Sequence, residues 1–338
     1  MSDILESPVS GAAVWTGVQL SGRSDWILPL SAAEVAEIDA ALASVKAAGA
    51  RLFEFGAGHF PLPTLAARLA AVREEVAEGR GFAVLRGLPI ARYSLDDARL
   101  LFWGLASHVG QPEGQDRAGN LMHQVTDTGK RVDGDNSTRG YETNDELHFH
   151  NDGGDAFMLL CVRAAQEGGM SKLVSVGALF NEMLRRRPDL ARVAQQPFHF
   201  DSRSQNAAEK VQVVPVFTWH AGRLNVLYKR RYIETGQRFP EVPRLTPAQV
   251  EALDLIDAIC ADPAFHLSFQ MQQGDIQIGN NFSVLHSRTS YRDWPEADRR
   301  RLLLRVWMTL ANGRPLPQVY ATTREFGQTY RRREAALT

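Results

Sequence analysis

Apolar residues recur at helical spacing in five segments of the chain. The first segment follows Ser31, a favourable N-cap that has Glu34 three residues later, and it ends at Gly49. The other four segments are 63–79, 94–109, 178–187 and 246–260. Each keeps its apolar side chains on one face, so the pattern predicts five amphipathic helices.

Short apolar runs bounded by turn residues lie between and after these helices. The most apolar is 157–162 (FMLLCV). The other strand candidates are 81–88, 198–201, 212–218, 224–228, 265–272, 276–278, 283–286 and 302–310. Many short strands at modest spacing are typical of an antiparallel barrel or jelly roll. The sequence therefore predicts an α+β, mainly β fold, with a double-stranded β-helix (jelly-roll) core and flanking helices.

Neither an internal repeat nor a flexible linker divides the sequence, so we expect a single domain over residues 1–338. Residues 1–80 would form an N-terminal arm and helices. Residues 81–312 would form the jelly-roll core with its insertions.

Residues 110–144 are rich in Gly, Asp, Asn and Thr and lead directly into the stretch 147–155, which reads as a strand. A long polar segment inside a compact domain is usually functional or disordered. We interpret it as an active-site lid, with Asn136, Arg139, Tyr141 and Asn144 near the opening. A solvated connection without a role remains the alternative for each of these side chains.

Composition narrows the class of protein. The formal net charge is −1, with 44% hydrophobic and 23% charged residues, so no general field attracts nucleic acid or an anionic membrane. No apolar run is long enough for a transmembrane helix, and the N-terminus lacks the pattern of a secretory signal. Cys161 and Cys260 stand in apolar surroundings, as expected for buried reduced thiols. We expect a cytoplasmic protein with no nucleic-acid or membrane partner. The sequence leaves open whether the protein forms a homo-oligomer.

The stretch 147–155 (LHFHNDGGD) contains the clearest candidate chemistry. In an extended segment His150 and Asp152 point to the same face, so both can reach one metal ion. Two histidines and one carboxylate are the ligand set of non-haem Fe(II) oxygenases. His286, in another strand and turn segment, is the best candidate for the second histidine. The chain has nine histidines, so a chance H-x-D triplet is the alternative.

Arg301 and Arg305 are four residues apart in the apolar run RLLLRVWM, and in a strand they share a face. A buried guanidinium needs an anionic partner, and its planar fork suits a carboxylate. The pair therefore indicates a carboxylate-binding cavity. For Arg305, an ion pair within the core remains the alternative.

Together these residues resemble the Fe(II)/2-oxoglutarate-dependent dioxygenases related to taurine catabolism dioxygenase, over about residues 80–312. The H-x-D pair corresponds to His150 and Asp152, and the distal histidine to His286. A Gly-Gly-x-Ser segment supplies Ser171, and an Asn-containing turn precedes the distal histidine. Phe282 stands in that turn where close relatives often carry arginine, so taurine is not the expected substrate.

The resemblance implies that His150, Asp152 and His286 bind Fe(II). Ser171 and Arg301 would hold the distal carboxylate of 2-oxoglutarate, with Arg305 nearer the iron or the prime substrate. The register among the three consecutive arginines 299–301 stays open.

The reaction implied is hydroxylation of an unactivated C–H bond of a small polar molecule by O2, with decarboxylation of 2-oxoglutarate to succinate and CO2. Because Asp152 is retained, halogenation is not expected, whereas desaturation or cyclisation stays open. Besides the lid residues, Tyr228, Arg231 and Arg305 are candidates for substrate contact. A zinc hydrolase with the same three ligands and a non-catalytic 2-oxoglutarate-binding barrel are the alternatives from other classes.

Overall fold

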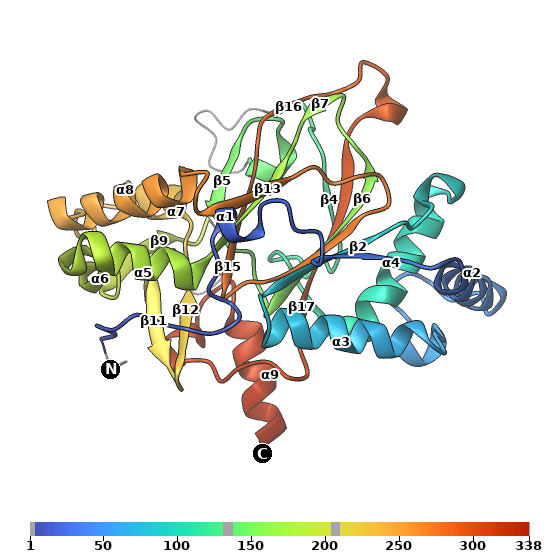
Figure 1. The fold of residues 1–338 in the computed structure, drawn as a ribbon, viewed down its shortest axis with the longest axis horizontal. Coiled ribbons are helices and arrows are strands. Elements are labelled where there is room, and N and C mark those ends of the chain that lie inside the picture. Colours follow the sequence, from blue (N-terminus) through green and yellow to red (C-terminus); the bar gives the residue numbers. More distant parts are fainter. Residues whose placement is uncertain (1–3, 131–137, 204–209, 338) are drawn as a thin grey trace.

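The computed structural model describes residues 4–130, 138–203 and 210–337 of the chain (Figure 1). It is a mixed α/β protein built on two main sheets. The larger sheet runs in the order β1-β2-β14-β6-β17-β3, with β4 also paired to β17. Its strands are β1 (Ile27–Pro29), β2 (Phe82–Arg86), β14 (Ile276–Asn280), β6 (Ala156–Arg163), β17 (Leu302–Thr309), β3 (Gln111–Glu113) and β4 (His123–Val125). All its pairings are antiparallel except the parallel pair β1–β2.

The smaller sheet is antiparallel and runs β13-β8-β15-β5. Its strands are β13 (His266–Phe269), β8 (Ser171–Ser175), β15 (Val284–Arg288) and β5 (Leu147–His150). One hydrophobic cluster joins the two sheets, because it contains Phe157 and Leu159 of β6 together with Leu173 of β8 and Val284 of β15. Two of the metal-ligand candidates, His150 and His286, lie on strands of the smaller sheet, and Asp152 lies in the loop between β5 and β6.

Strand alternation explains the layers outside the sheets. In β2, Phe82 and Val84 belong to the interior cluster, whereas Ala83 and Leu85 belong to a second cluster formed with the N-terminal helices. These helices are α2 (Ala32–Ala47), α3 (Leu65–Ala77) and α4 (Leu95–Val109), which lie to one side of the sheets in Figure 1. Both faces of the larger sheet are therefore buried.

A third cluster covers the smaller sheet on its other face and contains Val174 of β8 and Leu285 of β15. The elements that supply it are α5 (Val176–Arg186), α6 (Pro188–Val193), α7 (Arg230–Gly236), α8 (Pro247–Ala261), β9 (Pro197–Asp201), β10 (Val211–Pro215), β11 (Phe217–His220) and β12 (Arg223–Val226). The remaining elements are α1 (Gly17–Leu20), α9 (Gly327–Leu337), the β7 (Glu167–Gly168)–β16 (Tyr291–Arg292) pair, and the 3-10 turns η1 (Ala57–His59), η2 (Ile90–Arg92), η3 (Gly140–Glu142), η4 (Ala297–Arg299) and η5 (Gln318–Tyr320).

All five predicted helices are present, and the capping box at Ser31 and Glu34 forms as expected. The candidate strand 212–218 is in fact two strands, because β10 ends at Pro215, which has no N–H to continue a ladder. Cys161 and Cys260 are buried free thiols. None of the described helices has the length and apolar character needed to cross a membrane.

The segment 110–144 differs from the irregular stretch that its composition indicates. Its described part contributes β3 and β4 to the larger sheet and the turn η3 near β5. Asn136, one of the predicted lid residues, lies outside the described residues. The segment is therefore anchored to β17 at its first half.

Candidate metal and cosubstrate site

His150, Asp152 and His286 come together with one ligand atom from each within 4.8 Å of the others. His150 ends β5, and His286 lies directly opposite it in the register of β15. Their ring centroids are 4.2 Å apart, and His286 Nε2 is 3.7 Å from Asp152 Oδ2. In the described part of the chain this is the one such group of three or more His, Cys, Asp or Glu side chains.

The tautomer of His150 is set by its own strand. Its Nδ1 lies 2.8 Å from the backbone carbonyl oxygen of His148, to which only a protonated Nδ1 can donate. Nε2 of His150 then keeps its lone pair toward the other two ligands. Burial lowers the pKa of His150 to about 4, which keeps the ring neutral, as a metal ligand must be.

Asp152 is buried and ion-paired with Arg305, whose Nη1 lies 3.1 and 3.2 Å from the two carboxylate oxygens. Burial would raise the pKa of Asp152, but the charge of Arg305 and the two histidines hold it well below its usual range. Arg305 is itself oriented by a hydrogen bond from Nε to Gln115 Oε1 at 2.8 Å. The carboxylate is therefore kept ionised.

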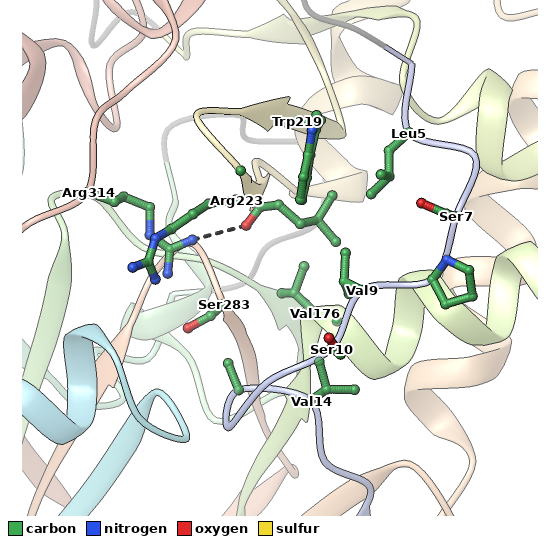
Figure 2. Close-up of a pocket in the computed structure, with 15 residues that line it drawn as sticks. Leu5, Ser7, Val9, Ser10, Val14, Val176, Trp219, Arg223, Ser283 and Arg314 are labelled. Carbon is green, nitrogen blue, oxygen red and sulfur yellow. Dashed lines mark hydrogen bonds between the residues drawn. The ribbon is translucent and has the colours of Figure 1, made fainter.

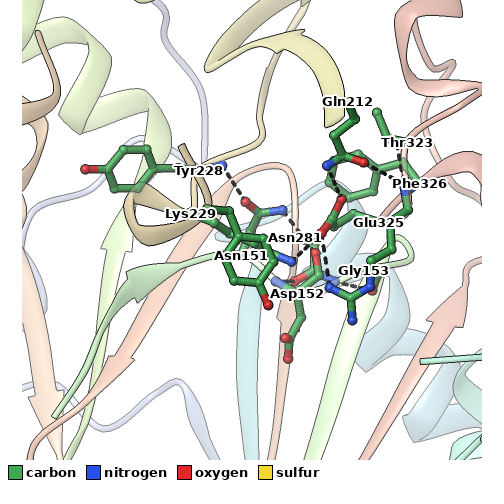
Figure 3. Close-up of polar contacts among 12 residues, drawn as sticks. Asn151, Asp152, Gly153, Gln212, Tyr228, Lys229, Asn281, Thr323, Glu325 and Phe326 are labelled. Carbon is green, nitrogen blue, oxygen red and sulfur yellow. Dashed lines mark hydrogen bonds and ion pairs between the residues drawn. The ribbon is translucent and has the colours of Figure 1, made fainter. Parts of the chain in front are cut away.

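Asn281 fixes the loop that carries Asp152 (Figure 3). Its Oδ1 accepts the backbone N–H of Asp152 at 3.0 Å, and its Nδ2 donates to the carbonyl oxygens of Gly153 and Gly154 at 2.6 and 3.3 Å. A side chain at position 153 would meet the Trp307 ring at 2.6 Å, so glycine is required there by space. The turn before β15 thus holds the loop of Asp152 beside the strand that carries His286.

Ser171, Arg301 and Arg288 line a pocket together with the three metal-ligand candidates. Arg301 is buried, and within the described chain its Nη1 has no hydrogen-bond partner. Arg288 is also buried; its Nη2 donates to Thr143 O, while Nε and Nη1 have no partner among the described residues. Burial and the charge of Arg301 lower the pKa of Arg288 to about 10. This pocket therefore presents unsatisfied donors for an anion.

A larger cavity of about 560 Å³ is also lined by His150 and Asp152. Four of the predicted substrate residues line it, namely Arg139, Tyr141, Arg231 and Arg305. Tyr228 does not line it. Its ring is fully buried in the cluster outside the smaller sheet, and its hydroxyl donates to Asp257.

Asn144 does not line the cavity either. Its carbonyl oxygen accepts the backbone N–H of Tyr291 at 3.1 Å, so its backbone joins the segment before β5 to β16.

Other basic and aromatic residues of the cavity were not predicted. They include Arg203, Lys229, Tyr232, Trp307 and Arg324. Lys229 and Tyr232 belong to the stretch YKRRY, which also contains the predicted residues Tyr228 and Arg231. Residues three apart share a face of a helix, so a helical interpretation of this stretch would have indicated that Lys229 and Tyr232 lie together. Nothing in the sequence relates Arg324 to this site, because it lies beyond the predicted core.

A separate cavity of about 310 Å³ lies between the N-terminal arm and the β11–β12 hairpin (Figure 2). Leu5, Val9 and Val14 of the arm line one side, and Arg314 donates to the carbonyl oxygen of Leu224 at 3.0 Å on the other. It contains none of the predicted site residues.

Among curated proteins, the chain is 28% identical over 334 residues to FR-33289 synthase of Streptomyces rubellomurinus, covering 96% of this chain and 97% of that protein. It is 30% identical over 311 residues to a taurine hydroxylase-like protein of Stachybotrys chartarum, covering 89% of this chain and 80% of the relative. A uridine-5'-phosphate dioxygenase of an Amycolatopsis species is 28% identical over 151 residues, 44% of this chain and 53% of that one.

Among solved structures, asparagine oxygenase in complex with Fe(II), hydroxyasparagine and succinate is similar with a TM-score of 0.61 and 20% identity, covering 84% of this chain and 93% of that one. The non-haem iron oxygenase OrfP in complex with Fe and alpha-ketoglutaric acid has a TM-score of 0.62 at 15% identity, with coverage of 84% and 93%. These likenesses show a shared fold. The family model described as taurine catabolism dioxygenase TauD, TfdA family matches residues 44–307, and the chain belongs to this family of dioxygenases.

Proposed function

We propose that this chain is an Fe(II)- and 2-oxoglutarate-dependent dioxygenase that hydroxylates an unactivated C–H bond of a small polar molecule. The single observation that carries the proposal is the convergence of His150, Asp152 and His286, with ligand atoms within 4.8 Å of one another, beside a pocket lined by Arg301. Family membership supports the reaction class. The names of the relatives support a small-molecule substrate.

The three side chains fit Fe(II) by the chemistry of their donors. Two neutral imidazoles and one carboxylate form the facial ligand set that leaves positions open for other ligands. The ionised state of Asp152 and the neutral state of His150 are both favoured by their surroundings. His150, Asp152 and His286 would hold the iron.

The pocket beside the metal ligands fits the distal carboxylate of 2-oxoglutarate. Arg301 and Arg288 offer buried donors, and Ser171 adds a hydroxyl. In the described parts of the chain neither guanidinium forms a salt bridge with a carboxylate, so a bound carboxylate would offset the cost of burying two cations side by side. We propose Arg301 as the main partner of this carboxylate, with Ser171 as its helper.

The chain's own residues would bind the iron and the cosubstrate, orient them and exclude water. When bound with O2, Fe(II) and 2-oxoglutarate supply the oxidising chemistry, in which the cosubstrate becomes succinate and CO2. Arg305 holds Asp152 ionised and oriented, and Asn281 holds its backbone. Phe157, whose ring centroid is 4.3 Å from that of His286, covers the ligand set on its inner side. No side chain is required as a general base.

Three further assignments belong to this proposal. The two sheets would constitute the double-stranded β-helix (jelly-roll) core of one catalytic domain over residues 1–338, with 81–312 as the core. Of the segment 110–144 that the sequence predicts as a lid, the described residues 138–144 would serve as one, supported by Arg139 and Tyr141 at the cavity, whereas β3 and β4 hold the first half in the larger sheet. The free buried thiols of Cys161 and Cys260 support a reducing, cytoplasmic location.

The test is succinate formation from 2-oxoglutarate with Fe(II) and O2, together with anaerobic iron binding. We expect the parent protein to bind one Fe(II) and to form succinate. His150→Ala and His286→Ala should each lose stoichiometric iron binding and turnover, because two remaining ligands cannot hold the ion.

His148→Ala is the matched control, since it removes a neighbouring imidazole that is not in the ligand group. It should retain iron. A parent protein that binds 2-oxoglutarate without forming succinate with any substrate would favour a non-catalytic binding protein. Activity with Zn(II) and without 2-oxoglutarate would favour a hydrolase.

A further inference from the structure

The far end of the large cavity is a group of basic side chains around one phenol, which we name the Tyr232 cluster. It consists of Tyr232, Arg139, Arg203, Lys229 and Arg324, and all five line the cavity. Arg139 Nη1 lies 3.2 Å from the Tyr232 hydroxyl oxygen. The Arg203 guanidinium and the Lys229 ammonium lie 5.3 and 5.4 Å from the centroid of its ring. Four cationic groups therefore surround one point.

Among the described residues, the cluster contains more positive charge than the neighbouring carboxylates balance. Glu325 accepts from Lys229 Nζ at 2.7 Å and lies 3.4 Å from Arg324 Nη1, so a single carboxylate serves two cations. In the described structure the side-chain hydrogen bonds of Arg139 go to neutral oxygens, namely the Tyr232 hydroxyl and the Arg203 carbonyl. Lys229, Arg324 and Arg139 together thus leave about two positive charges unbalanced.

The remaining acidic residues of the cavity do not change this balance at the cluster. Glu234 and Asp257 are ion-paired with Arg230, and Asp152 is paired with Arg305. Glu146 is exposed, and its charge is therefore screened by solvent.

The lowered pKa of Tyr232 reflects the same surplus of positive charge. Burial alone would raise the pKa of this phenol, but the charges of Arg324, Lys229, Arg139 and Arg203 outweigh it and lower the pKa to about 8. Negative charge is therefore favoured at this point of the cavity.

The path from the cluster to the metal ligands is partly aromatic. Lys229, Arg324 and Arg305 lie 5.9, 5.6 and 5.0 Å from the centroid of the Trp307 ring. The same cavity includes His150 and Asp152. A molecule whose head group is held at the cluster can therefore extend over Trp307 toward the metal.

We propose that the Tyr232 cluster binds a dianionic phosphoryl head group, as in a phosphonate or a phosphate monoester, of the prime substrate. This inference rests on the proposed function, since it assigns the substrate class of the same site. A phosphoryl group concentrates two charges and three acceptor oxygens on one atom, which matches donors converging on one point. A dicarboxylate spreads its charges over two separate groups.

The test compares four probes of equal chain length on the Fe(II)- and 2-oxoglutarate-loaded protein under nitrogen. The probes are propylphosphonate, propyl phosphate, propane-1-sulfonate and butyrate, titrated calorimetrically at mildly alkaline pH, where the first two are dianions. We expect both dianions to bind at least about tenfold tighter than the two monoanions, since one more charge-assisted contact is available. The ratio between the first two separates a phosphonate from a phosphate ester.

Arg139→Gln should weaken the binding of both dianions by roughly ten- to a hundredfold. Arg185→Gln, which alters an exposed arginine paired with Glu182, is the matched control and should bind all probes like the parent. Titration of 2-oxoglutarate and thermal unfolding of each variant report whether the fold and the metal site remain intact.

Equal or tighter binding of the sulfonate or of butyrate, no binding of any probe, or unchanged affinity in a folded Arg139→Gln variant would each overturn the inference. Failure of the proposed function looks different. In that case the iron-loaded parent would not bind 2-oxoglutarate or would form no succinate from it, whatever the probes do.

Discussion

Arg301 and Arg305 are four residues apart on the same strand, yet they have different partners. Arg305 is satisfied by Asp152 and Gln115, whereas Arg301 Nη1 has no partner in the described residues. A satisfied guanidinium orients its neighbours, and an unsatisfied buried one awaits an anion. The two substitutions should therefore have separable effects on cosubstrate binding.

Arg301→Ala should weaken 2-oxoglutarate binding by roughly ten- to a hundredfold, because a charge-assisted contact contributes about 1.5–3 kcal/mol. Arg301→Lys should restore only part of the affinity, since a point charge cannot reproduce the fork. The measurement is an anaerobic titration of 2-oxoglutarate into each Fe(II)-loaded variant, followed by the metal-to-ligand charge-transfer absorbance.

Arg300→Ala is the control, because the Arg300 side chain is exposed and its one hydrogen bond within the described chain goes to the carbonyl oxygen of Pro295. If Arg300→Ala or Arg305→Ala loses 2-oxoglutarate affinity while Arg301→Ala keeps it, the assignment of the cosubstrate arginine is wrong.

The convergence of His150 and Asp152 could be predicted from the sequence, because residues two apart in an extended segment lie on the same face whatever the rest of the fold is. Arg288 could not be predicted, although this residue is only two positions after His286. Its importance depends on β8 lying beside β15, which brings Ser171 directly opposite it. Tyr228 shows the converse, because its neighbours Lys229 and Arg231 face the cavity while its own ring is buried in the core.

At the scale of elements, the amphipathic helices and most strands could be predicted because one face of each is buried. The segment 110–144 could not, since β3 and β4 are three residues each and owe their structure to β17 rather than to their own pattern. The turn between β14 and β15 is the element that matters most for the ligand set. Asn281 in this turn makes three hydrogen bonds to the Asp152 loop.

Asn281→Ala should lower the free energy of unfolding by about 3 kcal/mol, because each buried polar group left unsatisfied costs about 1–3 kcal/mol. It should also weaken Fe(II) binding about tenfold or more, as loss of an outer partner of a metal ligand commonly does. Urea unfolding and anaerobic iron titration measure the two effects.

Asn120→Ala is the matched control, since the Asn120 side chain is exposed and its one hydrogen bond within the described chain goes to Asp116. It should change neither quantity appreciably. An Asn281→Ala variant that binds iron like the parent would show that the turn does not position Asp152.

At the scale of the whole molecule, the catalytic cavity depends on a segment outside the predicted core. Arg324 and Glu325 follow β17 by about fifteen residues, and the main-chain carbonyl of Glu325 accepts the N–H of Gly154 at 2.8 Å. Its carboxylate accepts from Lys229 and from Gln212 Nε2, each at 2.7 Å (Figure 3). The C-terminal segment, the β10 strand and the metal loop are thereby joined through one buried acid.

Glu325→Gln should therefore lower the free energy of unfolding by about 3–5 kcal/mol near neutral pH, because it leaves Lys229 and Arg324 buried without their shared carboxylate. Burial alone would raise the pKa of Glu325, but these two cations lower it to about 2. A lowered pKa means that the carboxylate's contribution is fully present above the unfolded-state pKa of about 4.3 and is lost as the pH falls toward 2. The difference in unfolding free energy between parent and variant should thus be constant from pH 8 to about 5 and shrink below it. Urea unfolding at several pH values measures this difference.

Glu54→Gln, at an exposed pair with Arg51, should change little at any pH. A Glu325→Gln variant as stable as Glu54→Gln would show that this acid does not join the C-terminal segment to the site.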